Sequence, residues 1–485
     1  MPFQELPVEL LQEILHHAFK VRGMKRFMRL RLVSKTLARE VENVIFVFRL
    51  LDGRLCEARF GLPPFVKRYL EHRVLNQAEA DGYPNLITIR KVAEKISQGA
   101  DVDGKGLDLH EVVERLCGLV LRLESTTGRL SRIFDKDPES NQQAFSDHLI
   151  VAAVECNCFD TLKSLSAESD WLWTNSWLFG SPYRIAAFNG DHDMLRYLMS
   201  ETINSDTRLP RLREQAFTAA AIAGRVETVK FLFHLRREEV PWRFEDRTKG
   251  TSGTYDQPLS SAMTTPSKEV LDFVTFLQKN YSTKKTIWRT DEESLTHRLR
   301  RCAEEGWTEM AAHLLVQGAC PDGIRADPES TFRPMIRACM RGHTDVVRLL
   351  LYYSADTNKA LHTAAFYGHR DIVMLLLDAG AATVGAIAEA ASGGWLDIIR
   401  LLLDHGAGID GPRNRPHPLQ SAFEQEHTAM FELLMQRGAT LTEQTFQACL
   451  RYAVADGLDS LASICRYYGD GDIPKNIQNY LDTHA

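Results

Sequence analysis

The stretch LHTAAFYGHRDIVMLLLDAGA runs from Leu361 to Ala381. Its neighbours have nearly the same pattern: MIRACMRGHTDVVRLLLYYSA covers Met335 to Ala355, and IAEAASGGWLDIIRLLLDHGA covers Ile387 to Ala407. The copies begin at intervals of 26 residues. A fixed period of this kind is typical of repeat architectures, in which each unit is one small motif that buries its apolar surface against its neighbours.

Three kinds of residue recur at matching places in these copies. Alanine lies in the first half of each copy, glycine in the middle and leucine in the second half. Glycine readily takes the left-handed conformation that ends a helix, so each copy is predicted to form two short helices. Neither helix can bury the leucine stripe alone, so the pairs are predicted to stack. These framework residues are Ala338, Ala364 and Ala390; Gly342, Gly368 and Gly394; and Leu350, Leu376 and Leu402.

The copies resemble the ankyrin repeat. Leu361 and His362 stand where the family's Thr-Pro-Leu-His motif ends, whereas Lys359 and Ala360 occupy the places of Thr and Pro. Family units are about 33 residues long, so the 26-residue units here are expected to lack the projecting β-hairpin, which should return where the spacing lengthens. The resemblance implies an α-solenoid whose surface binds an unidentified target protein, without catalysis and without a cofactor.

Weaker copies extend the array in both directions. They lie at 150–165, 183–199, 217–233, 260–277, 299–319 and 420–439, and a last stretch at 445–469 has the rhythm without the consensus. Terminal repeats are expected to be atypical because one of their faces meets water. The ankyrin array is therefore predicted to cover residues 145–485 with about ten units, degenerate at both ends.

The first 50 residues are predicted to form a separate module of three helices. The first helix starts at Pro7, which suits the first helical position, and it has one polar and one apolar face. The second contains Phe27, and the third follows Ser34, a residue type that caps helices. A module of this size buries little apolar surface by itself, so some of that surface is expected to be covered by a partner.

The stretches ELPVELLQEIL (Glu5–Leu15) and RLRLVSKTLAREV (Arg29–Val41) resemble the F-box. They share its Leu-Pro start, its acidic and apolar helix and its L-x-L-V-S-K segment, although Thr36-Leu37 stands where the family often has an aromatic residue. The resemblance implies docking on the Skp-type adaptor of a cullin–RING ubiquitin ligase, with the target on the repeats being ubiquitinated. Carried over to this chain, the adaptor contacts are Leu6, Pro7, Leu10, Leu11, Ile14, Leu30, Val33 and Leu37.

Two alternatives concern this N-terminal region. The helices could serve only as a cap on the array of a free-standing ankyrin scaffold or transcriptional regulator. Residues 20–39 contain many Lys and Arg residues and no acidic residue, which leaves a nuclear-import or nucleic-acid role open beside a solvated face that steers the module towards an acidic adaptor.

Residues 51–144 are predicted to form a helical bridge, so the whole chain is expected to be all-α. The segment SQGADVD at 97–103 resembles the end of an ankyrin unit and leaves open an earlier start of the array.

Composition limits the classes of protein that fit. The chain has 485 residues, of which 44% are hydrophobic and 25% charged, with a net charge of −6. A nucleic-acid-binding protein normally has a basic excess, so nucleic acid is not an expected partner. There is no apolar run long enough for a membrane span. The nine cysteines are scattered rather than arranged as a disulfide framework, which favours the cytoplasm or nucleus.

No motif for catalysis or metal binding is expected to be functional. DVDGKGLDLHEV (Asp101–Val112) has Lys105 and Val112 at calcium-loop positions that need oxygen ligands. Cys156 and Cys158 have no second pair at zinc spacing. His343 and His369 both follow a repeat glycine, and they are predicted to form a structural hydrogen bond in each repeat rather than a metal site.

Overall fold

The computed structural model describes fourteen stretches of the chain: residues 6–32, 34–52, 63–76, 83–102, 106–127, 133–134, 145–168, 175–200, 209–235, 264–281, 292–323, 333–411, 417–455 and 458–468. Within these stretches the regular structure is helical, and the one β-pairing is an isolated bridge between Ser176 and Gly180. The predicted all-α fold is confirmed.

Internal contacts divide the chain into two compact units. The first is Met1–Thr265 with Glu269–Thr283, and the second is Lys284–Ala485 with Pro266–Lys268. This division falls inside the predicted array, so the boundaries proposed at residues 50 and 144 stay predictions.

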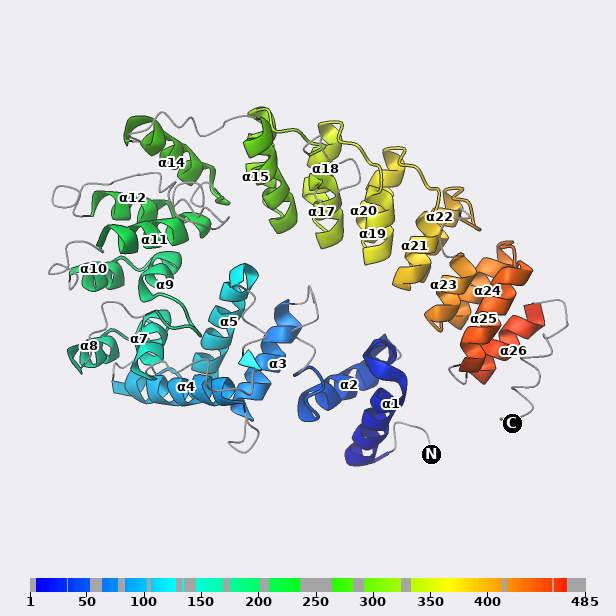
Figure 1. Cartoon of the computed structure of the whole chain (residues 1–485), viewed down its shortest axis with the longest axis horizontal. Helices are drawn as coiled ribbons and strands as arrows, with labels where there is room; N and C mark the ends of the chain where they lie inside the picture. Colours follow the sequence, from blue (N-terminus) through cyan, green and yellow to red (C-terminus); the bar gives the residue numbers. More distant parts are fainter. Residues whose placement is uncertain are drawn as a thin grey trace, which may run out of the picture. The chain divides into compact units, whose positions relative to one another are not determined.

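The first unit contains a series of helices that runs from the N-terminus to α14 (Figure 1). They are α1 (Val8–Arg29), the 3-10 helix η2 (Leu30–Leu32), α2 (Lys35–Val47), α3 (Pro63–Leu75), α4 (Pro84–Val102), α5 (Leu109–Thr127), α7 (Phe145–Glu155), α8 (Phe159–Glu168), α9 (Pro182–Asn189), α10 (His192–Ser200), α11 (Leu209–Ile222), α12 (Val226–His234) and α14 (Lys268–Tyr281).

The second unit is built from short helices that alternate as first and second members of pairs. They are α15 (Glu292–Glu305), α16 (Thr308–Val316), α17 (Pro334–Arg341), α18 (Thr344–Tyr352), α19 (Ala360–Tyr367), α20 (Arg370–Asp378), α21 (Ala386–Gly393), α22 (Leu396–Asp404), α23 (Pro418–Glu424), α24 (Thr428–Gln436), α25 (Glu443–Ala455) and α26 (Asp459–Tyr468).

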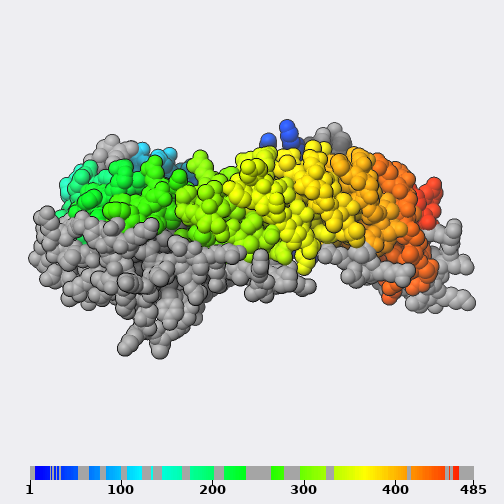
Figure 2. Space-filling model, turned by 90° about the horizontal axis from the view of Figure 1, so that it is seen from above, coloured from blue at the N-terminus to red at the C-terminus, as the bar shows by residue number. Residues whose placement is uncertain are grey.

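The pairs of the second unit stack along a curve, with α17, α19, α21 and α23 on its inner side (Figure 1). In the space-filling view the same pairs form a continuous surface (Figure 2). First helices of neighbouring pairs pack against each other more extensively than second helices do. The framework alanines of the first helices are fully buried and allow close approach, whereas the buried framework residues of the second helices are larger leucines. This difference in side-chain size accounts for the curvature.

The glycines end the first helices as the sequence indicates. Gly342, Gly368 and Gly394 have φ of 79°, 85° and 86°. This left-handed conformation costs other residues roughly 1–2 kcal/mol. In each case the helix closes with a hydrogen bond from the backbone N–H of the glycine or the next residue to the carbonyl of the framework alanine. The framework alanine and glycine of each unit therefore form the end of the first helix together, the alanine as hydrogen-bond acceptor and the glycine as the residue with positive φ.

Short connections replace hairpins in the 26-residue units. The backbone N–H of Ala360 donates to the carbonyl of Thr357 at 3.0 Å, and that of Ala386 donates to Thr383 at 3.0 Å. Lys359 and Gly385, at matching places in these turns, have φ of 64° and 84°. A single tight turn therefore connects the pairs where the family has Thr-Pro. In the two longer connections, residues 324–332 and 412–416 lie outside the described residues, so the expected return of hairpins there stays a prediction.

A buried histidine lies in α7. His148 is 3% exposed, and its Nδ1 lies 2.8 Å from Ser176 Oγ, which accepts a hydrogen bond from the backbone N–H of Phe179 at 2.9 Å. The serine hydroxyl can donate to a neutral imidazole. Burial lowers the pKa of His148 from 6.5 to about 4. The folded chain therefore favours the neutral ring.

Acid should weaken the packing around α7. The unfolded histidine binds a proton near pH 6.5, whereas the folded one does so only near pH 4. The free energy of unfolding thus has its full value above pH 6.5. It decreases by up to about 3 kcal/mol as the pH falls from 6.5 to 4, because His148 must then bind a proton in the unfolded chain but not in the folded one. We expect faster hydrogen exchange in α7 at pH 4.5 than at pH 7.5 after correction for intrinsic rates. His148→Gln should remove most of this difference; an equal pH effect in both proteins would contradict the assignment.

Candidate functional site: the N-terminal helix and the repeat surface

The N-terminal module has an apolar interior between α1 and α2. Leu11, Leu15 and Phe27 of α1 are buried, as are Val41 and Ile45 of α2. This arrangement depends on two local features of the backbone. Helix α1 changes direction at a glycine with φ of 74°, and the serine before α2 caps that helix, its Oγ accepting the N–H of the third residue along at 3.1 Å. The predicted cap at Ser34 is thereby confirmed.

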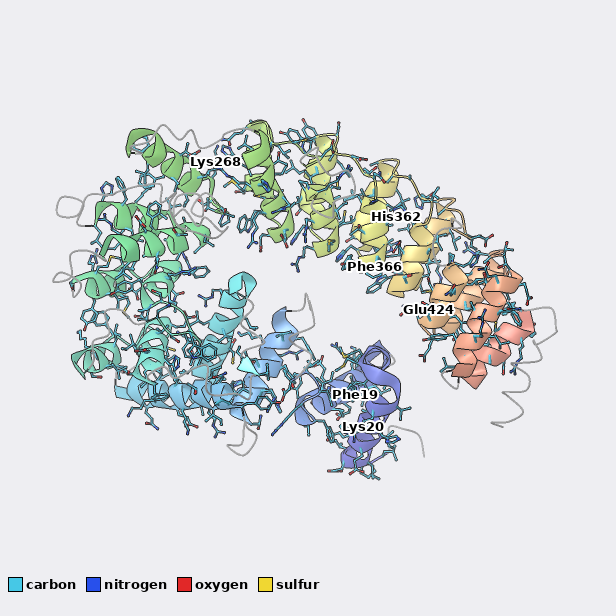
Figure 3. The ribbon with its side chains drawn as sticks, viewed as in Figure 1. Phe19, Lys20, Lys268, His362, Phe366 and Glu424 are labelled. Atoms are coloured by element: carbon cyan, nitrogen blue, oxygen red, sulfur yellow. The ribbon has the colours of Figure 1, made fainter. Side chains whose placement is uncertain are left out.

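A second apolar stripe of α1 faces solvent. Leu10, Ile14 and Val21 are 49%, 43% and 64% exposed. Their spacing of four and seven residues places them on one face of the helix. Figure 3 shows the side chains of this helix beside the labelled Phe19 and Lys20. Helix α1 is therefore apolar on two faces, and α2 covers one of them.

The predicted adaptor contacts divide between these faces. Pro7, Leu10 and Ile14 are exposed, and Leu6, Leu30 and Leu37 are partly buried. Leu11 packs inside the module, because it faces α2 rather than solvent. Val33 lies outside the described residues. The F-box resemblance grouped Leu10 with Leu11, whereas in the structure Leu10 is 49% exposed and Leu11 is buried.

The residue after each repeat glycine links one unit to the previous one. The Nε2 atoms of His343 and His369 lie 3.0 and 3.4 Å from the carbonyl oxygens of Glu304 and Met340. Trp395 Nε1 donates to the carbonyl of Phe366 at 2.9 Å in the same manner. These hydrogen bonds satisfy carbonyls at helix ends that the helix itself leaves unpaired. The structural role predicted for His343 and His369 is confirmed.

The same side chains cover the glycine of the previous unit. A Cβ at Gly342 would lie 2.7 Å from the His369 ring, and a Cβ at Gly368 would lie 2.3 Å from the Trp395 ring. Each glycine is therefore required both for its positive φ and for this close approach. Trp395 was not singled out from the sequence, although it stands at the same repeat position as the two histidines.

Aromatic side chains gather on the surface beside Trp395. Phe366, Tyr367 and Trp395 are 41%, 42% and 40% exposed. Phe366 and Tyr367 are the last two residues of α19, and Trp395 directly precedes α22. Phe366 lies on the inner side of the second unit (Figure 3). We call these three residues the aromatic patch. Large aromatic residues in solvent are enriched at protein-binding hot spots.

The described residues contain no group of three or more His, Cys, Asp or Glu side chains that could hold a metal ion. Burial raises the pKa of the thiols of Cys156, Cys302 and Cys339 to about 12, which keeps them protonated and poorly nucleophilic. Over these residues, no helix is both long and apolar enough to span a bilayer.

Comparison with known proteins identifies the repeats. A family model described as ankyrin repeats (3 copies) matches residues 299–386 and residues 361–445. No curated protein matches the chain. The matched residues cover α15 to the start of α25, where the glycine and alanine framework is most regular. Residues 299–445 of the chain therefore consist of ankyrin repeats, and they support a role in protein–protein interaction.

Proposed function

We propose that the chain is a substrate-recognition subunit of a cullin–RING (SCF-type) ubiquitin ligase. In this proposal the N-terminal module docks on a Skp-type adaptor, and the ankyrin repeats bind the protein to be ubiquitinated. The observation that carries it is the exposed stripe of Leu10, Ile14 and Val21 on α1. A helix that is apolar on a second, uncovered face is suited to a groove on a partner.

The alternative is a free-standing ankyrin scaffold or transcriptional regulator in which α1 and α2 only cap the array. A buried ion pair between Asp52, just after α2, and Arg73 of α3 favours this view, because it ties the module to the next helix. Such a cap would not need an apolar face in solvent. The two functions therefore differ in what they predict for α1.

Co-purification with a Skp-type adaptor tests the proposal. We expect the full chain to co-elute with the adaptor in size-exclusion chromatography, and a Leu10→Asp/Ile14→Asp variant to lose co-elution. The substituted side chains are exposed, so the variant should keep its helical content. Val316→Asp is the matched control, because Val316 is an equally apolar, exposed residue on α16; this variant should co-elute like the wild type.

Other outcomes would separate the alternatives. A folded wild-type chain that elutes alone with adaptor present would contradict ligase docking and favour the scaffold. Co-elution that survives Leu10→Asp/Ile14→Asp would show that the stripe is not the docking surface.

A further inference from the structure

Within the aromatic patch of Phe366, Tyr367 and Trp395, contacts on two sides hold Trp395 in place. Trp395 Nε1 donates to the Phe366 carbonyl at 2.9 Å, and its indole ring lies against Gly368. The rings of Phe366 and Tyr367 are 5.2 Å apart at an interplanar angle of 79°. Side chains that are already ordered lose little entropy on binding. The patch is thus a preorganised apolar contact surface.

The next two first helices, α21 and α23, follow the patch along the array. Gly393 of α21 touches the patch directly, since a Cβ there would meet the Phe366 carbonyl and the Trp395 ring. Glu389 lies one turn before Gly393 on the same helix face. In the next pair, Gln425 donates to the carbonyl of Ser392 at 2.9 Å, which places the end of α23 beside α21.

Glu424 is the last residue of α23. It is exposed and accepts a hydrogen bond from Gln420 Nε2 at 3.0 Å, and it has no ion pair with any residue that the structure describes. Helices α21 and α23 contain no Lys, Arg or His. Figure 3 shows Phe366 and Glu424 on the inner side of the second unit.

On helix α17, positive charge is partly offset by a glutamate of α15. Arg337 and Arg341 of α17 both lie near Glu304 of α15, at 3.8 and 3.5 Å. Their positive charge is therefore partly neutralised within the array. On the α23 side of the patch, Glu424 is thus an exposed carboxylate, whereas on the α17 side two arginines share one glutamate.

We propose that the inner surface of α19 to α23 binds an extended segment of a target protein that combines a large apolar side chain with Lys or Arg residues. The apolar side chain packs on the aromatic patch, and the cations lie by the exposed carboxylate of Glu424. Aromatic faces and carboxylates both favour a cation, whereas an acidic segment would be repelled. This inference rests on the proposed role of the repeats as the target-binding surface.

Selection from a random peptide library displayed on phage, against the immobilised full chain, tests this inference although the target is unidentified. We expect enriched peptides to combine Phe, Trp, Tyr or Leu with Lys or Arg, and to be depleted of Asp and Glu. The most enriched peptide, synthesised with a fluorescent label, then gives dissociation constants by anisotropy at low and high salt.

Substitutions locate the binding. Phe366→Ala should weaken binding at least tenfold, and Glu424→Gln about threefold with a smaller salt dependence. Two matched controls lie on second helices: Tyr352→Ala removes a more exposed aromatic from α18, and Asp378→Asn removes an exposed charge from α20. Neither control should change the affinity by more than twofold.

Three results would overturn the inference: no enrichment, enrichment of acidic peptides, or binding that Phe366→Ala leaves intact. Adaptor binding through α1 is measured separately and does not involve Phe366. An adaptor complex that forms normally while the selection fails would therefore reject this surface alone, and a successful selection without adaptor binding would reject the ligase role alone.

Discussion

Gly368→Ala is expected to destabilise the repeats by about 3–4 kcal/mol, far more than Gly394→Ala, although both glycines end first helices. The two residues have nearly equal φ, 85° and 86°, so the left-handed conformation costs each alanine about 1 kcal/mol. A Cβ at Gly368 also lies 2.3 Å from the Trp395 ring, whereas nothing lies within 4 Å of one at Gly394. Relieving that overlap must move a ring between two packed units, which adds about 2–3 kcal/mol.

Urea unfolding followed by circular dichroism measures both variants, with hydrogen exchange to localise the loss to α19–α22. A Gly368→Ala/Trp395→Ala double variant tests the cause. Without the Trp395 ring, Gly368→Ala should cost only what the left-handed conformation costs an alanine, so the two substitutions should not be additive. Equal destabilisation by Gly368→Ala and Gly394→Ala would show that backbone conformation alone sets the requirement for glycine.

Asp52→Ala is expected to cost about 3–5 kcal/mol in the stability of the first unit, the range found when other buried ion pairs are broken. Asp52 receives two hydrogen bonds from Arg73, at 2.9 and 2.8 Å, and a third from the Tyr69 hydroxyl at 2.6 Å. Arg73 is 1% exposed. Removing the carboxylate leaves a guanidinium and a hydroxyl buried without their acceptor, which is the costly part of the change.

Hydrogen exchange in α2 and α3 measures this effect. Glu111→Ala is the matched control, because the Arg115–Glu111 pair at 2.7 Å is solvent-exposed on α5 and should be worth less than about 1 kcal/mol. An Asp52→Leu/Arg73→Met variant should recover most of the lost stability, because it removes both charges of the buried ion pair together and leaves neither unpaired. If Asp52→Ala proves as mild as Glu111→Ala, the network does not hold the module to α3.

Much of the fold could be predicted because its determinants are local. The helix-ending glycines and the cap at Ser34 each depend on residues within a few positions of one another, and the 26-residue period repeats the same local pattern along the chain. The roles of His343 and His369 were also predictable, since a residue that repeats with the framework contacts the same partner in every unit.

The candidate sites depend on tertiary contacts, which the spacing of residues in the sequence does not reveal. Leu10 and Leu11 are adjacent and equally apolar, and the position of α2 decides that one meets solvent and the other the interior. Trp395 differs from His343 and His369 in size, and only its packing on Gly368 shows that it holds a surface patch together. Asp52 and Arg73 are 21 residues apart and belong to no repeating pattern, so their ion pair could not be predicted from the sequence.

The sequence by itself determined that residues 299–445 form stacked helix pairs of the ankyrin type, because repetition turns one local pattern into an extended architecture. Only the tertiary structure decided which apolar residues stay in solvent and where acidic residues lie beside them. Those properties depend on which neighbour covers each side chain, and that neighbour comes from another unit or another helix.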